Sequence, residues 1–413
     1  MTKEIPFIES LPSHWDVIPN RYLFYPDGKK VGSESANYQL LSLTTSGVKE
    51  RNINVGGGKV PASYDNYQTV KKGQMVFCLF DLDCSAVFSG ISNYNGMITS
   101  AYDVFSTSDR IDSRYADYWF KYVFSNRYYK MYSKNIRYTV TTDMFQSLKT
   151  PVPPLAEQRR ISDFLSQKES KVDALISNVQ AQIEKLKAYK QSLITEVVTK
   201  GLDPNAPMKD SGVEWIGTIP ASWKTIRVKQ LLRERKERSV NGKEEPLSMS
   251  QKVGLVPTKM LDMIPNMASS FVGAKLAYVD DLVFNKLKAH LGVFSVSKYD
   301  GLVSPDYAVY YSTGIIDLKY LEYLFKTPQC ISEFRKRSTG IAAGLTRLYT
   351  DGLFAIECPM PSKDEQAEIV LFLNEKCAQI DELMSLKQTK IEKLEQYKRS
   401  LIYEYVTGKK EVS

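Results

Sequence analysis

The sequence is dominated by an internal repeat at an offset of 208 residues. Residues 151–200 align without a gap to residues 359–408, and 24 of the 50 positions are identical. The same offset relates Trp15, in a Leu-Pro-x-x-Trp motif, to Trp223, in an Ile-Pro-x-x-Trp motif. Between these anchors the two halves diverge, and small shifts are needed to align them. The order is therefore variable domain, near-constant segment, variable domain, near-constant segment.

Both near-constant segments are predicted to be long helices. A Pro-Pro pair opens the first, and Ser362-x-x-Glu365 opens the second with the pattern of a capping box. Gly201 and Gly408 lie where a helix C-cap is expected. A helix of about 40 residues is about 60 Å long, so each segment is predicted to act as a spacer.

Apolar residues in both segments alternate steps of three and four, which is typical of a coiled-coil seam. We expect helix–helix packing by Val172, Ile176, Val179, Ile183, Leu186, Leu193, Ile380, Met384, Ile391, Leu394 and Leu401. Lys190 interrupts the first seam. Lys387 and Lys398 lie on the second, and partner contacts or snorkelling side chains are expected there. The alternative is a coil joining two copies of the chain. The duplication disfavours it, because one chain already supplies both helices.

Composition is that of a folded globular chain, with 43% hydrophobic and 25% charged residues. We expect no membrane helix and no secretory signal, since no run of about 20 apolar residues is present. Five cysteines without CxxC spacing favour a reducing cytoplasm. The net charge of +8 weakly favours a polyanionic partner.

The two variable regions are predicted to be mixed α/β domains, which makes the chain α+β. Residues 71–79 and 279–284 each resemble a turn entering a strand. Residues 114–132 and 318–337 are predicted helices whose aromatic stripes belong to the core. The mixed charges of 233–238 predict the solvated face of a helix.

Residues for catalysis are scarce. His14 and His290 are the only histidines, which excludes most histidine-based metal sites and catalytic triads. The glycine-rich run 55–59 lacks the pattern of a phosphate-binding loop and predicts a hairpin loop. Ser-Pro-Asp-Tyr at 304–307 lacks the other motifs of an amino-methyltransferase. These absences favour a binding protein.

Several motifs resemble one known family. Residues 211–223, Ser-Gly-Val-Glu-Trp-Ile-Gly-Thr-Ile-Pro-Ala-Ser-Trp, resemble the opening of a target-recognition domain in the specificity subunits of Type I restriction–modification systems. Pro-x-Pro-Pro-Leu-x-Glu-Gln at 151–158 and Tyr-Lys-x-Ser-Leu-Ile at 189–194 resemble the ends of the family's conserved helices. Both recur in the second half, although Ser-Lys replaces Pro-Leu there. The first domain lacks the Ser-Gly-x-x-Trp part of its opening.

The resemblance implies two recognition domains held apart by two long antiparallel helices that form a coiled coil with pseudo-two-fold symmetry. We therefore divide the chain into recognition domain 1 (1–150), helical spacer 1 (151–201), recognition domain 2 (202–358), helical spacer 2 (359–408) and a tail (409–413). It also implies double-stranded DNA, two methyltransferase subunits and motor-nuclease subunits as partners. No cofactor is then expected on this chain, and S-adenosylmethionine, Mg²⁺ and ATP are expected on the partners.

Contacts to DNA should divide into phosphate positioning and base reading. For phosphates we expect basic residues that follow the aromatic helices: Arg127, Lys130, Lys134, Arg137, Arg335, Lys336, Arg337 and Arg347. A solvated basic face is the alternative. For bases we expect one divergent loop, with Asp81 and Asp83 in the first domain and Lys286, Lys288 and His290 in the second. Lysine suits guanine acceptors and aspartate suits the cytosine amino group.

Two other functions stay open. The chain could be a coiled-coil scaffold that binds proteins and no DNA, or a nuclease or methyltransferase with unrecognised motifs. Salt-dependent DNA binding by the assembled complex separates the first from a DNA reader. Activity of the isolated chain would indicate the second.

Overall fold

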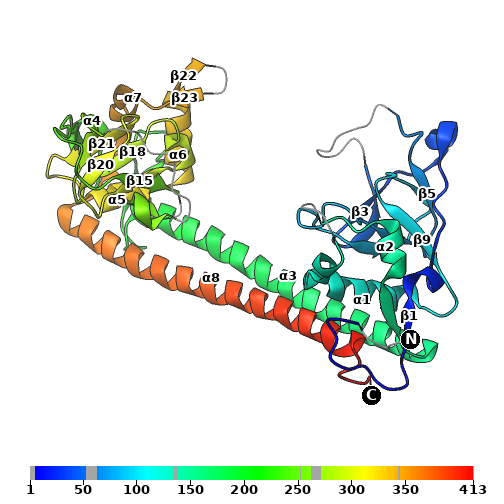
Figure 1. Cartoon of the computed structure of the whole chain (residues 1–413). Helices are drawn as coiled ribbons and strands as arrows, with labels where there is room; N and C mark the ends of the chain where they lie inside the picture. The colour runs from blue at the N-terminus through cyan, green and yellow to red at the C-terminus, as the bar shows by residue number, and fades with distance from the viewer. Residues whose placement is uncertain are drawn as a thin grey trace. The chain divides into compact units, whose positions relative to one another are not determined.

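The computed structural model describes residues 5–52, 63–133, 138–251, 253–261, 271–342 and 345–412, and it shows an α+β protein (Figure 1). The chain divides into two compact units, Met1–Gln180 with Gln388–Ser413, and Ala181–Lys387. Each unit contains one variable domain together with a part of each long helix. The units therefore cut across the boundaries drawn from the sequence.

The first unit is built around the antiparallel sheet β2-β9-β6-β7 and three two-stranded pairs, β1-β10, β3-β4 and β5-β8. Its strands are β1 (Asp16–Pro19), β2 (Phe24–Pro26), β3 (Leu41–Thr44), β4 (Gly47–Glu50), β5 (Gln68–Val70), β6 (Met75–Phe77), β7 (Ser89–Ile91), β8 (Gly96–Ile98), β9 (Asp103–Thr107) and β10 (Lys149–Val152). Its helices are η1 (Asn20–Tyr22), η2 (Gly32–Asn37), α1 (Ser113–Ser125), η3 (Tyr128–Met131) and α2 (Thr142–Ser147).

The second unit has the equivalent sheet β14-β21-β18-β19 and the equivalent pairs β13-β24, β15-β16 and β17-β20, with two further hairpins, β11-β12 and β22-β23. Its strands are β11 (Met208–Asp210), β12 (Thr218–Pro220), β13 (Lys224–Arg227), β14 (Leu232–Glu234), β15 (Leu247–Ser250), β16 (Gly254–Pro257), β17 (Lys275–Ala277), β18 (Leu282–Asn285), β19 (Phe294–Val296), β20 (Gly301–Val303), β21 (Tyr307–Ser312), β22 (Thr339–Ala342), β23 (Leu345–Arg347) and β24 (Glu357–Met360). Its helices are α4 (Val228–Leu231), η4 (Thr258–Met260), η5 (Ala289–Leu291), α5 (Leu318–Phe325), α6 (Pro328–Arg337) and α7 (Thr350–Phe354).

Glycine occupies one position of both domains for the same steric reason. A Cβ on Gly96 would lie 2.3 Å from the carbonyl oxygen of Gln39, and a Cβ on Gly301 would lie 2.2 Å from that of Glu245. Such contacts are far inside van der Waals distance, so only glycine fits at either strand.

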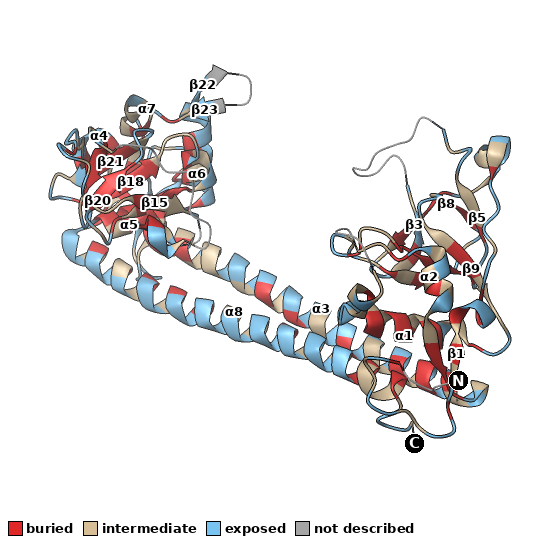
Figure 2. Ribbon diagram, viewed as in Figure 1, coloured by how far each residue is buried: buried red, intermediate tan, exposed pale blue. Residues whose placement is uncertain are grey.

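Two long helices, α3 (Leu155–Lys200) and α8 (Lys363–Val406), continue through both units. The predicted capping box is present, since the Ser362 amide donates to Glu365 at 2.9 Å and the Glu365 amide to the Ser362 hydroxyl at 3.3 Å. Gly201 and Gly408 have φ of 79° and 68°, the left-handed conformation of a C-cap. Every predicted seam residue is buried or half-buried, whereas the opposite helix faces are mostly exposed (Figure 2).

The three lysines on the seam each bind a polar side chain of the other long helix. Lys190 contacts Asp381 at 2.6 Å and Lys398 contacts Asp173 at 2.9 Å. These two ion pairs are copies of each other at the 208-residue offset. Lys387 donates to Gln182 at 2.6 Å. In the second unit these contacts run in opposite sequence order along the two helices. Lys190 and Lys398 have paired charges on the seam, whereas Lys387 binds a neutral amide.

A buried tryptophan fastens each domain to the start of one long helix. The indole Nε1 of Trp15 donates to Glu157 of α3, and that of Trp223 donates to Glu365 of α8, both at 3.1 Å. Both rings are 1% exposed. Although burial opposes ionisation, hydrogen bonds from the Ser362 amide and the Trp223 indole lower the pKa of Glu365.

A buried tyrosine fastens each domain to the end of the other long helix. The Tyr115 hydroxyl lies 3.4 Å from the carbonyl oxygen of Val406 in α8, within the first unit. The Tyr320 hydroxyl donates to the carbonyl oxygen of Val198 in α3 at 2.9 Å, within the second. The sequence repeat is therefore reproduced contact by contact.

The two predicted aromatic helices are each interrupted, and the helix predicted at 233–238 is wrong. The 114–132 segment forms α1 and then the short η3, and the 318–337 segment breaks at Pro328, which begins α6. Residues 233–238 are no helix: Leu232–Glu234 is the edge strand β14, paired with β21. The strand is favoured because Leu232 is fully buried under the sheet while Arg233 faces solvent. The glycine-rich run 55–59 lies outside the described residues.

Glu322 of α5 is a buried carboxylate whose ionisation stabilises the second unit. Its side chain is 3% exposed and contacts Lys319 at 2.7 Å and Lys326 at 2.5 Å. Burial opposes ionisation, but the two ammonium groups outweigh it and lower the pKa of Glu322. Because the folded pKa lies below the unfolded one, this stabilisation is complete above the unfolded value and is lost as pH falls through the folded value.

We expect Glu322→Gln to lower the free energy of unfolding by about 1–3 kcal/mol at pH 7, because the charged hydrogen bonds to both lysines are lost. The difference from the parent protein should shrink as pH falls from about 4.5, the ordinary pKa of glutamate, through the lowered pKa of Glu322 in the folded protein. Urea unfolding at several pH values measures both effects. Glu392→Gln, at an exposed position of α8, is the matched control. An equal loss at low and neutral pH would contradict the assignment.

Candidate nucleic-acid interface

The divergent loop follows the same central strand in both domains. The amide of Val140 donates to Leu79 after β6, and the amide of Leu348 donates to Lys286 after β18. Since these two bonds are equivalent, Asp81 and Asp83 of the first domain lie at the positions of Lys288 and His290 in the second. The same scaffold therefore presents acidic side chains in one domain and basic ones in the other.

In the first domain, residues predicted to contact phosphates lie beside residues predicted to read bases. Asp83 lies 2.9 Å from the Lys130 ammonium and 3.5 Å from the Arg127 guanidinium, and it accepts from the Tyr129 hydroxyl at 3.2 Å. The hydrogen bond from Lys130 holds the pKa of Asp83 below its usual value. Asp81 and Arg127 both have left-handed backbones, with φ of 49° and 55°. Such strained non-glycine residues cluster at functional sites.

Arg127 is the most exposed member of this cluster, with 62% of its side chain accessible. Asp83 and Lys130 are each 32% accessible. Lys134 and Arg137 lie outside the described residues.

In the second domain Lys288 is exposed, and Lys286 and His290 are half-buried. The Nδ1 atom of His290 is buried and has no hydrogen-bond partner among the described residues. Lys275, a residue that the sequence did not single out, lies near Lys286 and is 8% exposed. Burial and the Lys286 charge lower the pKa of Lys275. The only feature of the sequence that could have indicated Lys275 is a lysine in an otherwise apolar strand.

The basic end of α6 is partly neutralised. Lys336 and Arg337 contact the buried Glu333 at 2.9 Å and 3.4 Å, and the hydrogen bond to Glu333 raises the pKa of Lys336. Arg335 is exposed on the same helix.

Arg347 is held on the hairpin that follows α6. Its Nη2 contacts Asp306 at 2.9 Å, and 25% of its side chain is exposed. Its Nε is buried and lacks a hydrogen-bond partner among the described residues.

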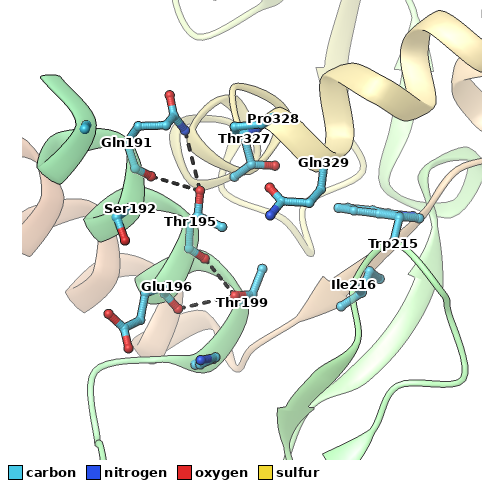
Figure 3. Close-up of a pocket in the computed structure, with 12 residues that line it drawn as sticks. Gln191, Ser192, Thr195, Glu196, Thr199, Trp215, Ile216, Thr327, Pro328 and Gln329 are labelled. Carbon is cyan, nitrogen blue, oxygen red and sulfur yellow. Dashed lines mark hydrogen bonds between the residues drawn. The ribbon is translucent and has the colours of Figure 1, made fainter. Parts of the chain in front are cut away.

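A groove of about 670 Å³ lies along the end of α3 in the second unit (Figure 3). Gln191, Thr195 and Thr199 line it from α3, opposite Trp215 and Gln329. Trp215 belongs to the opening segment of the domain, and Gln329 lies in the first turn of α6.

The first unit has an equivalent groove of about 380 Å³ at the end of α8. Five of its lining residues stand at the 208-residue offset from lining residues of the larger groove: Phe7, Ile8, Ser400, Tyr403 and Thr407. The groove is thus duplicated, with Phe7 at the position of Trp215. Sequence reasoning missed both copies, although all these residues lie in or beside the repeated motifs.

Neither metal binding nor a membrane span is indicated in the described part of the chain. It contains no group of three or more His, Cys, Asp or Glu side chains placed to hold a metal ion. None of its helices is long and apolar enough to cross a membrane.

Comparison with known proteins shows which proteins this chain is similar to. Residues 96–185, from β8 into α3, match the type I restriction modification DNA specificity domain. The chain is 25% identical over 288 residues to the type I restriction enzyme MjaVIII specificity subunit of Methanocaldococcus jannaschii. It is 26% identical over 291 residues to the putative type I restriction enzyme MjaX specificity subunit of the same organism. The chain is therefore similar to type I specificity subunits in sequence, and the DNA specificity domain is matched over residues 96–185.

These alignments cover 65% and 66% of this chain, and they span less than two thirds of the relatives, 64% and 61% of their lengths. Two solved structures share the fold of this chain. One, from work on complex assembly and conformational transition of the type I R-M system, has a TM-score of 0.71 at 14% identity and covers 97% of this chain and 99% of its own. The HsdS subunit from Thermoanaerobacter tengcongensis has a TM-score of 0.54 at 14% identity, with 98% and 100% coverage.

Proposed function

We propose that this chain is the non-catalytic DNA-recognition subunit of a type I restriction–modification complex in the cytoplasm. Each domain binds one half of a bipartite, asymmetric target. The observation that carries this proposal is the pair of equivalent loops, which hold Asp81 and Asp83 in one domain and Lys288 and His290 in the other. Aspartate and lysine favour different base edges, so the two half-sites should differ.

The long helices are proposed to form an antiparallel coiled coil that relates the two domains by a pseudo-two-fold axis. The copied ion pairs Lys190–Asp381 and Lys398–Asp173 support this arrangement. Two-fold symmetry matches that of the duplex backbone, and protein geometry then sets the half-site spacing. A stretch of unread base pairs would separate the half-sites.

Phosphate positioning is assigned to the exposed cations that flank the loops, including Arg127, Lys130, Arg335, Lys336 and Arg337. Lys130 pairs with the half-buried Asp83, and Lys336 and Arg337 share the buried Glu333. Because all three cations keep part of their side chains exposed, they can meet phosphates without breaking these ion pairs. Base reading is assigned to the Asp81–Asp83 loop and to Lys286, Lys288 and His290.

The partners are proposed to be two methyltransferase subunits, with motor-nuclease subunits in the full complex. The duplicated groove supports two equivalent docking positions, because the same lining positions recur at the end of α3 and of α8. The cofactors, S-adenosylmethionine, Mg²⁺ and ATP, would bind the partners. That assignment agrees with the name specificity subunit carried by the relatives.

The test is a genome-wide map of methylated bases in cells with this gene intact and with it deleted. We expect deletion to erase one asymmetric two-part motif and to leave other motifs unchanged. Persistence of every motif, in cells that express the methyltransferase partner, would refute targeting by this chain.

The scaffold alternative predicts a different response to salt. If about six phosphates are neutralised, affinity for a DNA duplex should fall by about 10³-fold between 50 mM and 200 mM salt. Fluorescence anisotropy with the assembled complex measures this slope. Binding that is absent or independent of salt would favour a scaffold, and methylation by the isolated chain would indicate an enzyme.

A further inference from the structure

The pair formed by Arg347 and Asp306 is the most directional polar arrangement on the candidate interface of the second domain. Arg347 ends β23, and Asp306 lies in the turn before β21. Their contact is 2.9 Å long, and the Asp306 side chain is 54% exposed. The guanidinium is therefore oriented by a carboxylate that itself faces solvent.

The turn that carries Asp306 is fixed by three further bonds. The Asp306 amide donates to the Ser304 hydroxyl at 3.3 Å, and the Tyr307 amide donates to the Ser304 carbonyl at 2.9 Å. The buried Lys275 donates to the carbonyl of Tyr307. Asp306 is thus held by the backbone around it, and it holds Arg347 in turn.

Most donors of Arg347 remain unused. Asp306 takes one hydrogen bond from Nη2, and within the described residues neither Nε nor Nη1 has an acceptor. A guanidinium carries five N–H donors, and 25% of the Arg347 side chain is exposed, which leaves donors for a ligand that offers acceptors. A planar guanidinium with a fixed orientation suits a planar pair of acceptors better than a mobile point charge.

The net charge of the Arg347–Asp306 pair favours a base over a phosphate as its ligand. The carboxylate neutralises the guanidinium and would repel a phosphate brought to the same place. A guanine edge carries no net charge and offers the two acceptors O6 and N7, while the paired cytosine offers an amino donor that suits a carboxylate. We propose that Arg347 and Asp306 together read one G·C base pair in the major groove, with Arg347 on guanine and Asp306 on cytosine.

This proposal rests on the proposed DNA-recognition function and moves Arg347 from phosphate positioning to base reading. The proposal also predicts that only the second domain reads a base pair in this way. The equivalent bonds of Val140 and Leu348 place Thr139 of the first domain at the position of Arg347. The equivalent registers of β9 and β21 place Ala101 at the position of Asp306. Neither side chain offers a guanidinium or a carboxylate.

The experiment maps methylated motifs in cells that carry the methyltransferase partner and express the full-length chain, Arg347→Ala, Arg347→Lys or Asp306→Ala. Arg227→Ala is the matched control, since Arg227 also pairs with a carboxylate, Glu357, on strands β13 and β24. We expect one G·C position of one half-site to become degenerate in all three variants. Discrimination at that position should fall from roughly 5- to 150-fold to near unity. The other half-site and the Arg227→Ala motif should stay unchanged.

Three results would overturn the proposal. Arg347→Ala could lower methylation equally at every target and leave the motif intact, which is the response of a phosphate contact. Arg347 and Asp306 variants could relax different positions. Arg347→Lys could keep full discrimination, which would show that charge alone suffices. The unchanged half-site reports that the complex is folded, and absence of any two-part motif with the parent chain would instead refute the proposed function.

Discussion

Replacing Trp223 with alanine is expected to lower the free energy of unfolding by about 3–5 kcal/mol. The indole is 1% exposed, packs against the Gly201 cap at the end of α3, and donates to Glu365 at 3.1 Å. Its removal leaves a cavity beneath the domain and removes one hydrogen bond from a carboxylate that is partly shielded from water. Urea unfolding followed by circular dichroism measures the loss.

Trp223→Phe separates the two contributions, because it keeps an aromatic ring and removes the indole N–H. We expect it to cost clearly less than the alanine variant. Trp15→Ala, the equivalent change in the first unit, should cost a similar amount, since Trp15 has the same burial and the same bond to Glu157. A loss below about 1 kcal/mol for both alanine variants would show that these tryptophans do not anchor their domains.

Replacing residues 16–150 with 224–358 is expected to give a chain that directs methylation to a symmetric target. The two segments have equal length, because both ends fall at the 208-residue offset. Each begins in β1 or β13 and ends in the paired strand, β10 or β24, so strand register is retained. With two copies of the second domain, both half-sites should equal the second half-site of the parent, in inverted orientation.

The parent target should be lost at the same time. Each mismatched base pair costs about 1–3 kcal/mol, so two or three mismatches weaken binding by at least about thirtyfold. Methylation mapping reads both results, and the reciprocal hybrid with two first domains is the control. A hybrid that still modifies the parent's asymmetric target would show that the exchanged segments do not read the sequence.

Features set by local sequence patterns were predictable, and features set by distant contacts were not. The helix ends at Gly201 and Gly408 and the capping box at Ser362 follow from short-range hydrogen bonds, and all of them are present. Residues 233–238 were misjudged because mixed charges suit a helix face and an exposed edge strand equally well. This segment forms a strand because it pairs with β21, which lies far along the chain.

The candidate site shows the same division. The alignment of Asp81 and Asp83 with Lys288 and His290 was visible in the repeat, but the contact of Asp83 with Lys130 was not. Nor could the sequence reveal Lys275 beneath Lys286, the Arg347–Asp306 pair, or the grooves at Trp215 and Phe7. Each of these depends on residues from different strands, helices or loops coming together in the folded domain, and the spacing of residue types along the sequence does not report such contacts.

The bond between Tyr115 and the carbonyl of Val406 joins residues 291 positions apart. The first unit needs Gln388–Ser413 to complete its core, whereas the second unit is one continuous stretch, Ala181–Lys387. During synthesis the chain emerges from its N-terminus, and contacts distant in sequence form late. The domain made first is therefore expected to finish folding last, after the ribosome has released the C-terminal turns of α8.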